Sequence, residues 1–447
     1  MSDRKKRAIS GIIAGSGGSL VVQLATIVVT PFYLDLTSQE LFGLWLTLLA
    51  ILGWIKIGDM GLGMALTKRS VEALESNDYE LLLRLAYGAM LPAFIFSIFF
   101  AGIGYILTDK LISVFDINDI LEDEFKSTYY LLLVIAAFRP AFGVFGSLID
   151  GKQHIAFLGV RNTVVSLLTT AVTLLFLYLN FGIISFAYGL LFELLVIPFI
   201  DITYLKIVDK KVRFFPIKTS KKEVVALLEF GGPFQILKLT NIISTNVDNL
   251  IIASLIGLAS VPIYVFTGKL AFVSAIFLIG IIPSMLFPGI AQLFELGDFK
   301  RIQRVYVKLS NIAIRIGLLA GVIYFTINEA FISIWVGSEN FGGVELSAIF
   351  VVWIIFESFV RGITIIIHSS GKLKSLAIVS CIEAIINICL TLMLIKHIGI
   401  FGAVLASVLS RLVSVFYIPL KINTILSLEH SRYLSELKDG SIFAPCQ

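Results

Sequence analysis

Twelve long apolar segments dominate the 447-residue sequence and constrain its fold more than any other feature. Most of them run for about 20 residues or more, the length that an α-helix needs to cross the hydrocarbon core of a bilayer. Only 15% of the residues are charged, against about 25% in an ordinary soluble domain. A transmembrane barrel would instead show alternating segments of roughly ten residues. The sequence therefore predicts an all-α polytopic membrane protein.

The twelve predicted transmembrane helices cover residues 9–33, 41–66, 85–108, 128–149, 155–180, 182–205, 224–256, 260–290, 305–327, 344–367, 373–395 and 399–420. Lys and Arg in short loops mark the cytoplasmic side of such a chain. With a cytoplasmic N-terminus, the inside segments hold 24 Lys and Arg, and the outside loops hold three. Both termini are therefore predicted to be cytoplasmic. The basic start at residues 4–7 precedes a retained first helix rather than a cleaved signal peptide.

Short motifs recur at the ends of equivalent helices, about 220 residues apart, and indicate an internal repeat. Residues 75–79 (ESNDY) correspond to 295–299 (ELGDF), and the Gly-Lys pair at 151–152 corresponds to the pair at 371–372. Six helices in each half give a parallel repeat. The predicted organisation is an N-terminal six-helix bundle (1–205), a cytoplasmic linker (206–223), a C-terminal six-helix bundle (224–424) and a cytoplasmic tail (425–447).

Eight Lys and Arg residues lie inside the predicted transmembrane helices. Each would cost roughly 2.5–3.5 kcal/mol at the centre of a helix that faces lipid. We therefore expect them to face one another, acidic partners or a watery interior. They are Lys56, Arg139, Arg161, Lys238, Lys269, Arg315, Arg361 and Arg411.

Some of these cations have an acid close by on the same helix. Lys56 lies three residues before Asp59, and a purely structural pair explains it as well as a functional one. Arg361 lies four residues after Glu357 and allows the same two interpretations. For the cations as a group, the functional interpretation is a cavity that holds an anion, most naturally a phosphate or pyrophosphate. The predicted substrate-binding residues are Arg139, Lys238 and Arg411, which lie nearest the midplane without an acid within one turn, together with Lys269 and Arg361.

Six carboxylates also lie inside the predicted helices: Asp59, Glu193, Glu229, Asp248, Glu357 and Glu383. Such a group can take up and release a proton, or bind a cation, as access to it alternates. Neutralisation of the intramembrane cations is the alternative. Glu229 and Asp248, both in the seventh helix, are the predicted ion-coupling residues.

The sequence shows no constellation for catalysis or metal binding. Its four histidines are scattered without metal-ligand spacing, and its three cysteines are too few for a metal site or a disulfide framework. We therefore expect no catalytic residue, no metal and no cofactor.

Two stretches resemble a known family. Residues 42–45 (FGLW), 57–63 (IGDMGLG) and 67–69 (TKR) resemble helix 2 of Wzx-type O-antigen flippases and related polysaccharide exporters. Residues 246–252 (NVDNLII), followed by Tyr264 and Lys269, resemble the matching region of helices 7 and 8. The resemblance covers essentially the whole chain and points to the multidrug/oligosaccharidyl-lipid/polysaccharide exporter superfamily.

That resemblance implies two six-helix bundles that form a V around a central cavity and work by alternating access. The implied substrate is an undecaprenyl-pyrophosphate-linked oligosaccharide, an O-antigen-type repeat unit, moved across the bacterial cytoplasmic (inner) membrane with ion or proton coupling. The expected partners are this lipid-linked oligosaccharide, membrane lipid, a polysaccharide polymerase and a chain-length regulator. No nucleic acid is expected.

Two other functions are alternatives. A multidrug or cation antiporter of the same superfamily would share the architecture. Eight intramembrane cations against six carboxylates leave a mildly positive interior, however, which favours a flippase over an exporter of lipophilic cations. A membrane enzyme of polysaccharide assembly would need a sizeable extramembrane loop with catalytic groups, and the outer loops are short. We therefore expect a transporter rather than an enzyme.

Overall fold

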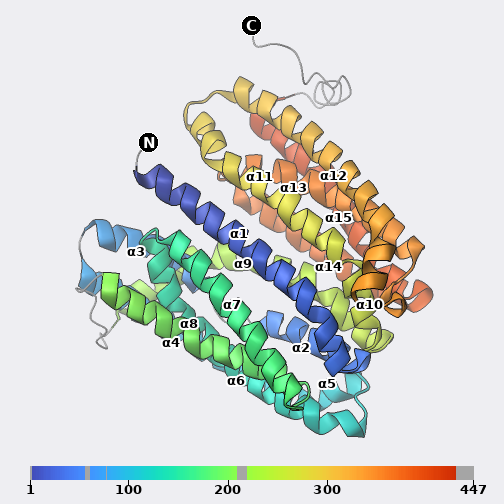
Figure 1. Ribbon diagram of the computed structural model, residues 1–447. Coiled ribbons are helices and arrows are strands. Elements are labelled where there is room, and N and C mark those ends of the chain that lie inside the picture. The colour runs from blue at the N-terminus through green and yellow to red at the C-terminus, as the bar shows by residue number, and fades with distance from the viewer. Residues whose placement is uncertain (1–2, 56–60, 77, 209–218, 429–447) are drawn as a thin grey trace. The chain divides into compact units, whose positions relative to one another are not determined.

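The structure is a computed structural model that describes residues 3–55, 61–76, 78–208 and 219–428 (Figure 1). Over these residues the regular secondary structure is helical, without strands. Among the described helices, eight are long and apolar enough to cross a membrane by their length and composition. The predicted class, an all-α polytopic membrane protein, is confirmed.

The chain divides into two compact units. The N-terminal unit comprises residues 1–242 and 257–259, and the C-terminal unit comprises residues 243–256 and those from 260 onward. The division therefore falls inside α9 (Lys221–Leu255), whereas the sequence places it in the linker 206–223. Residues 209–218 of that linker lie outside the described residues. The assignment of six transmembrane helices to each half stays a prediction.

The N-terminal unit contains helices α1 to α8 and the first part of α9 (Figure 1). In this unit α1 packs along α7, and α6 contacts α3, α4 and α8. Within the predicted helix 41–66, residues 56–60 lie outside the described residues, and α3 begins after Gly61, whose φ of 70° a side chain rarely adopts. The helices are α1 (Asp3–Leu36), α2 (Gln39–Ile55), α3 (Leu62–Glu75), α4 (Tyr79–Ile106), α5 (Thr108–Val114), α6 (Asp119–Gly151), α7 (Ile155–Tyr178) and α8 (Ile184–Val208).

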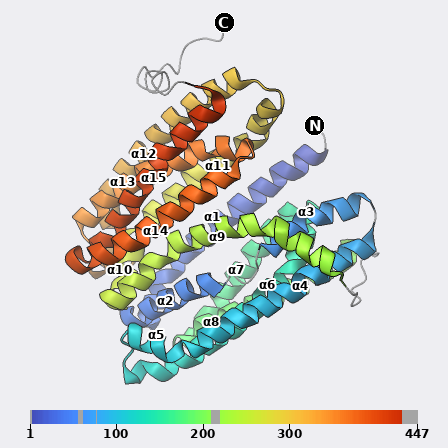
Figure 2. The same ribbon diagram turned by 180° about the vertical axis from the view of Figure 1, so that it is seen from behind.

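The C-terminal unit is built around α13, which packs against α11, α12 and α15, while α14 packs along α15 (Figure 2). The predicted helix 260–290 is divided between α10 and α11. At this break the carbonyl of Thr267 accepts hydrogen bonds from Tyr324 Oη (2.8 Å) and Asn328 Nδ2 (3.2 Å), so side chains of α12 satisfy the backbone there. The elements are α10 (Ser260–Thr267), α11 (Lys269–Glu295), α12 (Phe299–Trp335), η2 (Ser338–Asn340), α13 (Val344–Ser369), α14 (Leu373–Ile398) and α15 (Ile400–Leu426).

Two glycines allow α12 to approach α13 closely. A Cβ on Gly317 would lie 2.9 Å from the Cβ of Ser358, and one on Gly321 would lie 2.9 Å from Cγ1 of Val351. These glycines are four residues apart and therefore lie on one face of α12. Small residues at this spacing let membrane helices pack backbone against backbone.

We predict that Gly321→Ile destabilises the C-terminal unit by about 1–3 kcal/mol, because the added side chain overpacks the α12–α13 interface. Thermal unfolding in detergent measures the effect as a lower Tm. Leu319→Ile is the matched control, since Leu319 is an exposed residue of the same helix. Equal Tm values for the two variants would contradict the packing described.

Candidate functional site

In the N-terminal unit, Arg139 of α6 forms an ion pair with Glu193 of α8. Nη2 of Arg139 lies 2.5 Å from Oε1 of Glu193, and the two side chains are 36% and 17% exposed. Arg139 also lines a cavity of about 220 Å³ between α2, α3, α4 and α6. The other lining residues are mostly apolar, among them Leu52, Leu62 and Val144. Among the described residues that line this cavity, Arg139 is the charged one.

A second ion pair in this unit joins Arg161 of α7 to Asp201 of α8. The side-chain oxygen of Asn162 also accepts hydrogen bonds from Nε (3.2 Å) and Nη2 (2.8 Å) of Arg161. Since protein groups occupy its guanidinium and Asp201 is fully buried, the pair links α7 to α8 structurally. Asp201 is missing from the predicted intramembrane carboxylates because it lies close to the predicted end of its helix.

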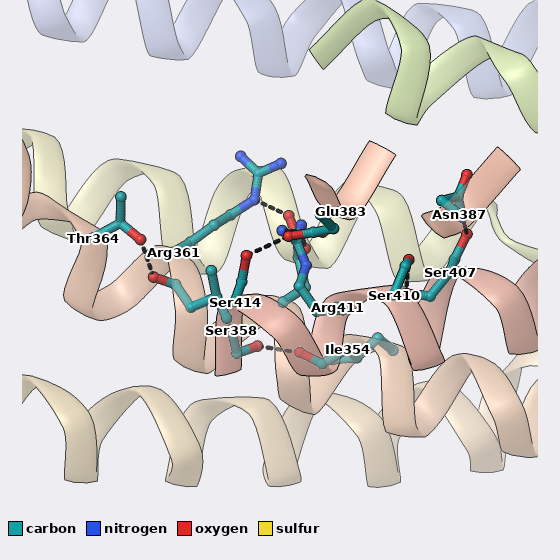
Figure 3. Close-up of polar contacts among 12 residues, drawn as sticks. Ile354, Ser358, Arg361, Thr364, Glu383, Asn387, Ser407, Ser410, Arg411 and Ser414 are labelled. Carbon is teal, nitrogen blue, oxygen red and sulfur yellow. Dashed lines mark hydrogen bonds and ion pairs between the residues drawn. The ribbon is translucent and has the colours of Figure 1, made fainter. Parts of the chain in front are cut away.

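The C-terminal unit holds a larger network, of which Figure 3 labels Arg361, Arg411, Glu383 and Ser414. The buried carboxylate of Glu357 pairs with Arg361, one turn later on α13, and with Arg411 of α15. Nη1 of Arg411 lies 2.8 Å from Oε1 of Glu383 on α14, and Ser414 donates a hydrogen bond to the same carboxylate. The predicted local pair of Glu357 and Arg361 is confirmed. Two cations and two carboxylates give this network no net charge.

Arg361 and Arg411 differ in whether the terminal nitrogens of the guanidinium group are paired. Arg411 pairs with a carboxylate through each terminal nitrogen. Arg361 pairs with Glu357 through Nε, and neither of its terminal nitrogens bonds to a residue that the structure describes. Its side chain is 43% exposed, and Figure 3 shows the two nitrogens pointing away from the other labelled side chains. The N–H groups of such a fork can donate hydrogen bonds to two oxygens of one phosphate.

The ion pairs of the two units correspond to each other in the repeat, with their signs exchanged. Arg139 and Glu193 are 54 residues apart, and so are Glu357 and Arg411. Each position lies 218 residues before its counterpart (139 and 357, 193 and 411). The arginine of the N-terminal pair thus corresponds to the glutamate of the C-terminal pair. The ends of α6 and α13 (Gly151 and Ser369) and the starts of α7 and α14 (Ile155 and Leu373) show the same offset of 218. The structure therefore supports an internal repeat, but at these helices its offset is 218 rather than the 220 of the two Gly-Lys pairs.

Asp248 of α9 lies in a buried cluster of oxygen-bearing side chains within the C-terminal unit. Its Oδ2 accepts hydrogen bonds from Tyr264 Oη (2.8 Å) and Ser407 Oγ (3.1 Å), and its Oδ1 accepts one from Thr391 Oγ1 (3.4 Å). Asn387 donates to Ser407 (3.0 Å), while its own Oδ1 is buried without a described partner. No Lys, Arg or His of the described residues pairs with this carboxylate.

Sequence reasoning selected Asp248 but missed its surroundings. Asn387 and Thr391 lie four residues apart on the apolar helix α14, which places two polar side chains on one face. That spacing was a usable signal. Ser407 had none, because single hydroxyls are common in membrane helices, and Tyr264 was marked only by the family resemblance of its region.

The remaining predicted residues are placed as follows. Glu229 is exposed on α9 and has no ion-pair partner among the described residues. Lys269, at the first position of α11, is partly buried. Lys238 lies in α9, but its side chain is outside the part that the structure describes, and Lys56 and Asp59 lie outside the described residues altogether. The roles of these residues stay predictions.

We predict that the N-terminal pair tolerates an exchange of sign, because the C-terminal pair has the opposite order. Arg139→Glu alone brings two carboxylates together and should cost roughly 2 kcal/mol, less than a fully buried pair because both side chains are partly exposed. Adding Glu193→Arg should restore most of the loss in Tm. A double variant as unstable as the single one would show that the pair is not interchangeable.

The comparisons with known proteins agree with this architecture. Residues 8–294 match a family described as "Polysaccharide biosynthesis protein". A protein of Shigella flexneri named "Putative O-antigen transporter" is 21% identical, over 83% of this chain and 86% of its own length. One of the same name from Salmonella typhimurium is 23% identical, over 91% of this chain and 92% of its own length.

Solved structures share the fold. An inward-facing multidrug resistance MATE family transporter of the MOP superfamily superposes with a TM-score of 0.73 and 15% identity, over 99% of this chain and 97% of that chain. A MOP superfamily transporter from Pyrococcus furiosus, described as having a binding pocket of reverse polarity, gives a TM-score of 0.62 at 14% identity, over 96% and 98%. The resemblance to Wzx-type O-antigen flippases is confirmed, and the chain belongs to the polysaccharide biosynthesis protein family.

Proposed function

We propose that this protein translocates an undecaprenyl-pyrophosphate-linked oligosaccharide, an O-antigen-type repeat unit, across the bacterial cytoplasmic membrane by alternating access. The names of its relatives support transport of an O-antigen component. The observation that carries the proposal is the open fork of Arg361 inside a helix that belongs to a membrane-spanning bundle. A polyprenyl-linked sugar has one strongly anionic group, its pyrophosphate, and this fork matches that group.

The network around Arg361 suits a substrate that must also be released. Glu357 holds the arginine through Nε and leaves its terminal nitrogens for the ligand. Arg411 and Glu383 complete the charge balance, so the pyrophosphate is bound by direct hydrogen bonds rather than by a large net positive field. Arg139, which lines the cavity of the N-terminal unit, stays a predicted substrate-binding residue of that unit.

Coupling to an ion gradient is assigned to Asp248. Its carboxylate is buried, unpaired with any described cation and hydrogen-bonded to three hydroxyl groups, those of Tyr264, Thr391 and Ser407. Oxygen ligands of this kind suit a small hard cation, and a carboxylate in the same place can also carry a proton. Glu229 remains the second predicted coupling residue.

The proposed orientation puts both termini in the cytoplasm, as the distribution of Lys and Arg between the loops favours. The oligosaccharide would then leave on the outer side, where a polysaccharide polymerase and a chain-length regulator would use it. A transporter is proposed rather than an enzyme. The fold itself does not separate a flippase from a multidrug antiporter, because both share it.

We predict that Arg361→Ala lowers surface O-antigen about 10- to 100-fold, because a hydrogen bond to a charged group contributes about 1.5–3 kcal/mol. The measurement uses a bacterial strain that lacks its own O-antigen flippase and carries this protein with the matching sugar-assembly enzymes. Arg361→Lys should give an intermediate level, since it keeps the charge but loses the fork. Lys372→Ala is the control, because Lys372 is an exposed cation of the turn between α13 and α14.

Membrane levels of each variant are measured in parallel, so that loss of protein is distinguished from loss of transport. Failure of the unaltered protein to restore surface O-antigen would overturn the proposed function. Full activity of Arg361→Ala would leave the proposed function standing and would show that Arg361 does not bind the substrate.

We predict that Asp248→Asn abolishes the response of transport to an imposed gradient. The asparagine keeps a side chain of the same shape but can neither neutralise a cation nor exchange a proton at this position. Flipping is followed in proteoliposomes with a sodium gradient, with a proton gradient and with neither. Glu229→Gln is the matched comparison. A sodium or proton response that survives in Asp248→Asn but disappears in Glu229→Gln would move the coupling role to Glu229.

A further inference from the structure

Five cations form a stripe along the first half of α12. Successive residues of an α-helix are about 100° apart around its axis, which places all five within an arc of about 100°. They are exposed, and none of their side chains pairs with a residue that the structure describes. We call them the α12 stripe: Lys300, Arg301, Arg304, Lys308 and Arg315.

The same face of α12 continues as an apolar surface. Leu318, Leu319 and Val322 lie in the same arc and are 49%, 61% and 61% exposed. Large exposed aliphatic side chains on a membrane helix are more favourable next to lipid hydrocarbon than next to water. The stripe is therefore on the lipid side of the C-terminal unit. Over about 22 Å, the rise of 15 helical residues, this face changes from cationic to apolar.

Contacts at the start of α12 fix which face of the helix is packed against the unit and which face is exposed. Asp298 caps the helix by accepting a hydrogen bond from the backbone N–H of Arg301 (3.1 Å). Gln303 donates to the carbonyl of Leu426 at the end of α15 (2.9 Å). Ile302 and Tyr306 are fully buried on the opposite face. The packed face is thus apolar, and the cations are held outward.

The repeat provides an internal comparison. On α4, Ile95 stands 220 residues before Arg315 and is 56% exposed. Arg84 corresponds to Arg304, but it pairs with Glu80 (3.5 Å) and Glu223 (3.5 Å). The equivalent face of the N-terminal unit is therefore apolar where α12 carries its deepest cation. A lipid-facing helix at this place in the repeat therefore does not need a row of cations, and the presence of the α12 stripe needs a separate explanation.

We propose that the α12 stripe binds the head group of an anionic phospholipid. Unpaired Lys and Arg at the end of a lipid-facing helix attract anionic lipids, and long cationic side chains next to hydrocarbon extend toward the head groups. Lys308 and Arg315 are seven residues apart, about 10 Å along the axis, so one phosphate can be reached by both side chains. Lys300, Arg301 and Arg304 add attraction at the membrane surface.

This proposal requires only that the chain spans a membrane, and it is independent of the transported substrate. The test uses the purified full chain in detergent, with phosphatidylglycerol or phosphatidylcholine added, and measures lipid binding by native mass spectrometry. The variant is Lys308→Gln with Arg315→Ile, the second change copying Ile95 of the repeat. The control, Lys372→Gln with Lys374→Gln, removes the same charge from exposed positions at the α13–α14 turn.

The unaltered protein and the control should bind phosphatidylglycerol more tightly than phosphatidylcholine. The stripe variant should bind phosphatidylglycerol roughly 30-fold more weakly, since each Lys or Arg near an anionic surface contributes about a fivefold factor. Unchanged phosphatidylglycerol binding by the stripe variant would overturn the proposal, and so would equal binding of the two lipids by the unaltered protein. If the double variant does not fold, Arg315→Ile alone is measured, with a weaker but still selective loss expected.

Discussion

Pairing of charges between apolar helices is the interaction on which the described structure depends. An arginine or glutamate inside a membrane is stable only beside an opposite charge, hydrogen-bonding groups or water. In the N-terminal unit this requirement joins α6 to α8 and α7 to α8. In the C-terminal unit it joins α13, α14 and α15 through Glu357, Arg411 and Glu383. The ion pairs thus hold together the helices that carry the proposed site.

The two units meet this requirement with equivalent residues of opposite sign. The C-terminal unit then adds Glu383 and Arg361 to the shared pair, and the added arginine is the one with an open fork. Pairing therefore offsets the cost of placing these charges in a membrane. Arg361, whose terminal nitrogens have no described partner, is proposed to bind an anion. Asp248 shows the reverse arrangement, a buried carboxylate among neutral oxygens that can accept a positive ion. The proposed anion site at Arg361 and the proposed cation site at Asp248 would supply what an ion-coupled exporter of an anionic lipid needs.

Much of the fold could be predicted from the sequence, because the length of an apolar segment fixes a membrane helix directly. The pair of Glu357 and Arg361 was also predictable, since residues four apart on a helix are neighbours. The pair of Arg139 and Glu193 was not, because the residues are 54 positions apart and meet only through the packing of two helices. The left-handed turn at Gly61 and the break after Thr267 were missed because hydropathy does not report backbone conformation. The polar neighbours of Asp248 depend on three further helices, and one sequence without its fold does not bring them together.

The most direct test of the account is transport by the purified protein in proteoliposomes. The substrate is a fluorescent oligosaccharide on a polyprenyl pyrophosphate, and the same glycan on an uncharged lipid is the comparison. The account predicts rapid movement of the pyrophosphate-linked substrate between leaflets and little movement of the uncharged analogue. Equal rates for both lipids, or no rate above that of protein-free liposomes, would contradict it.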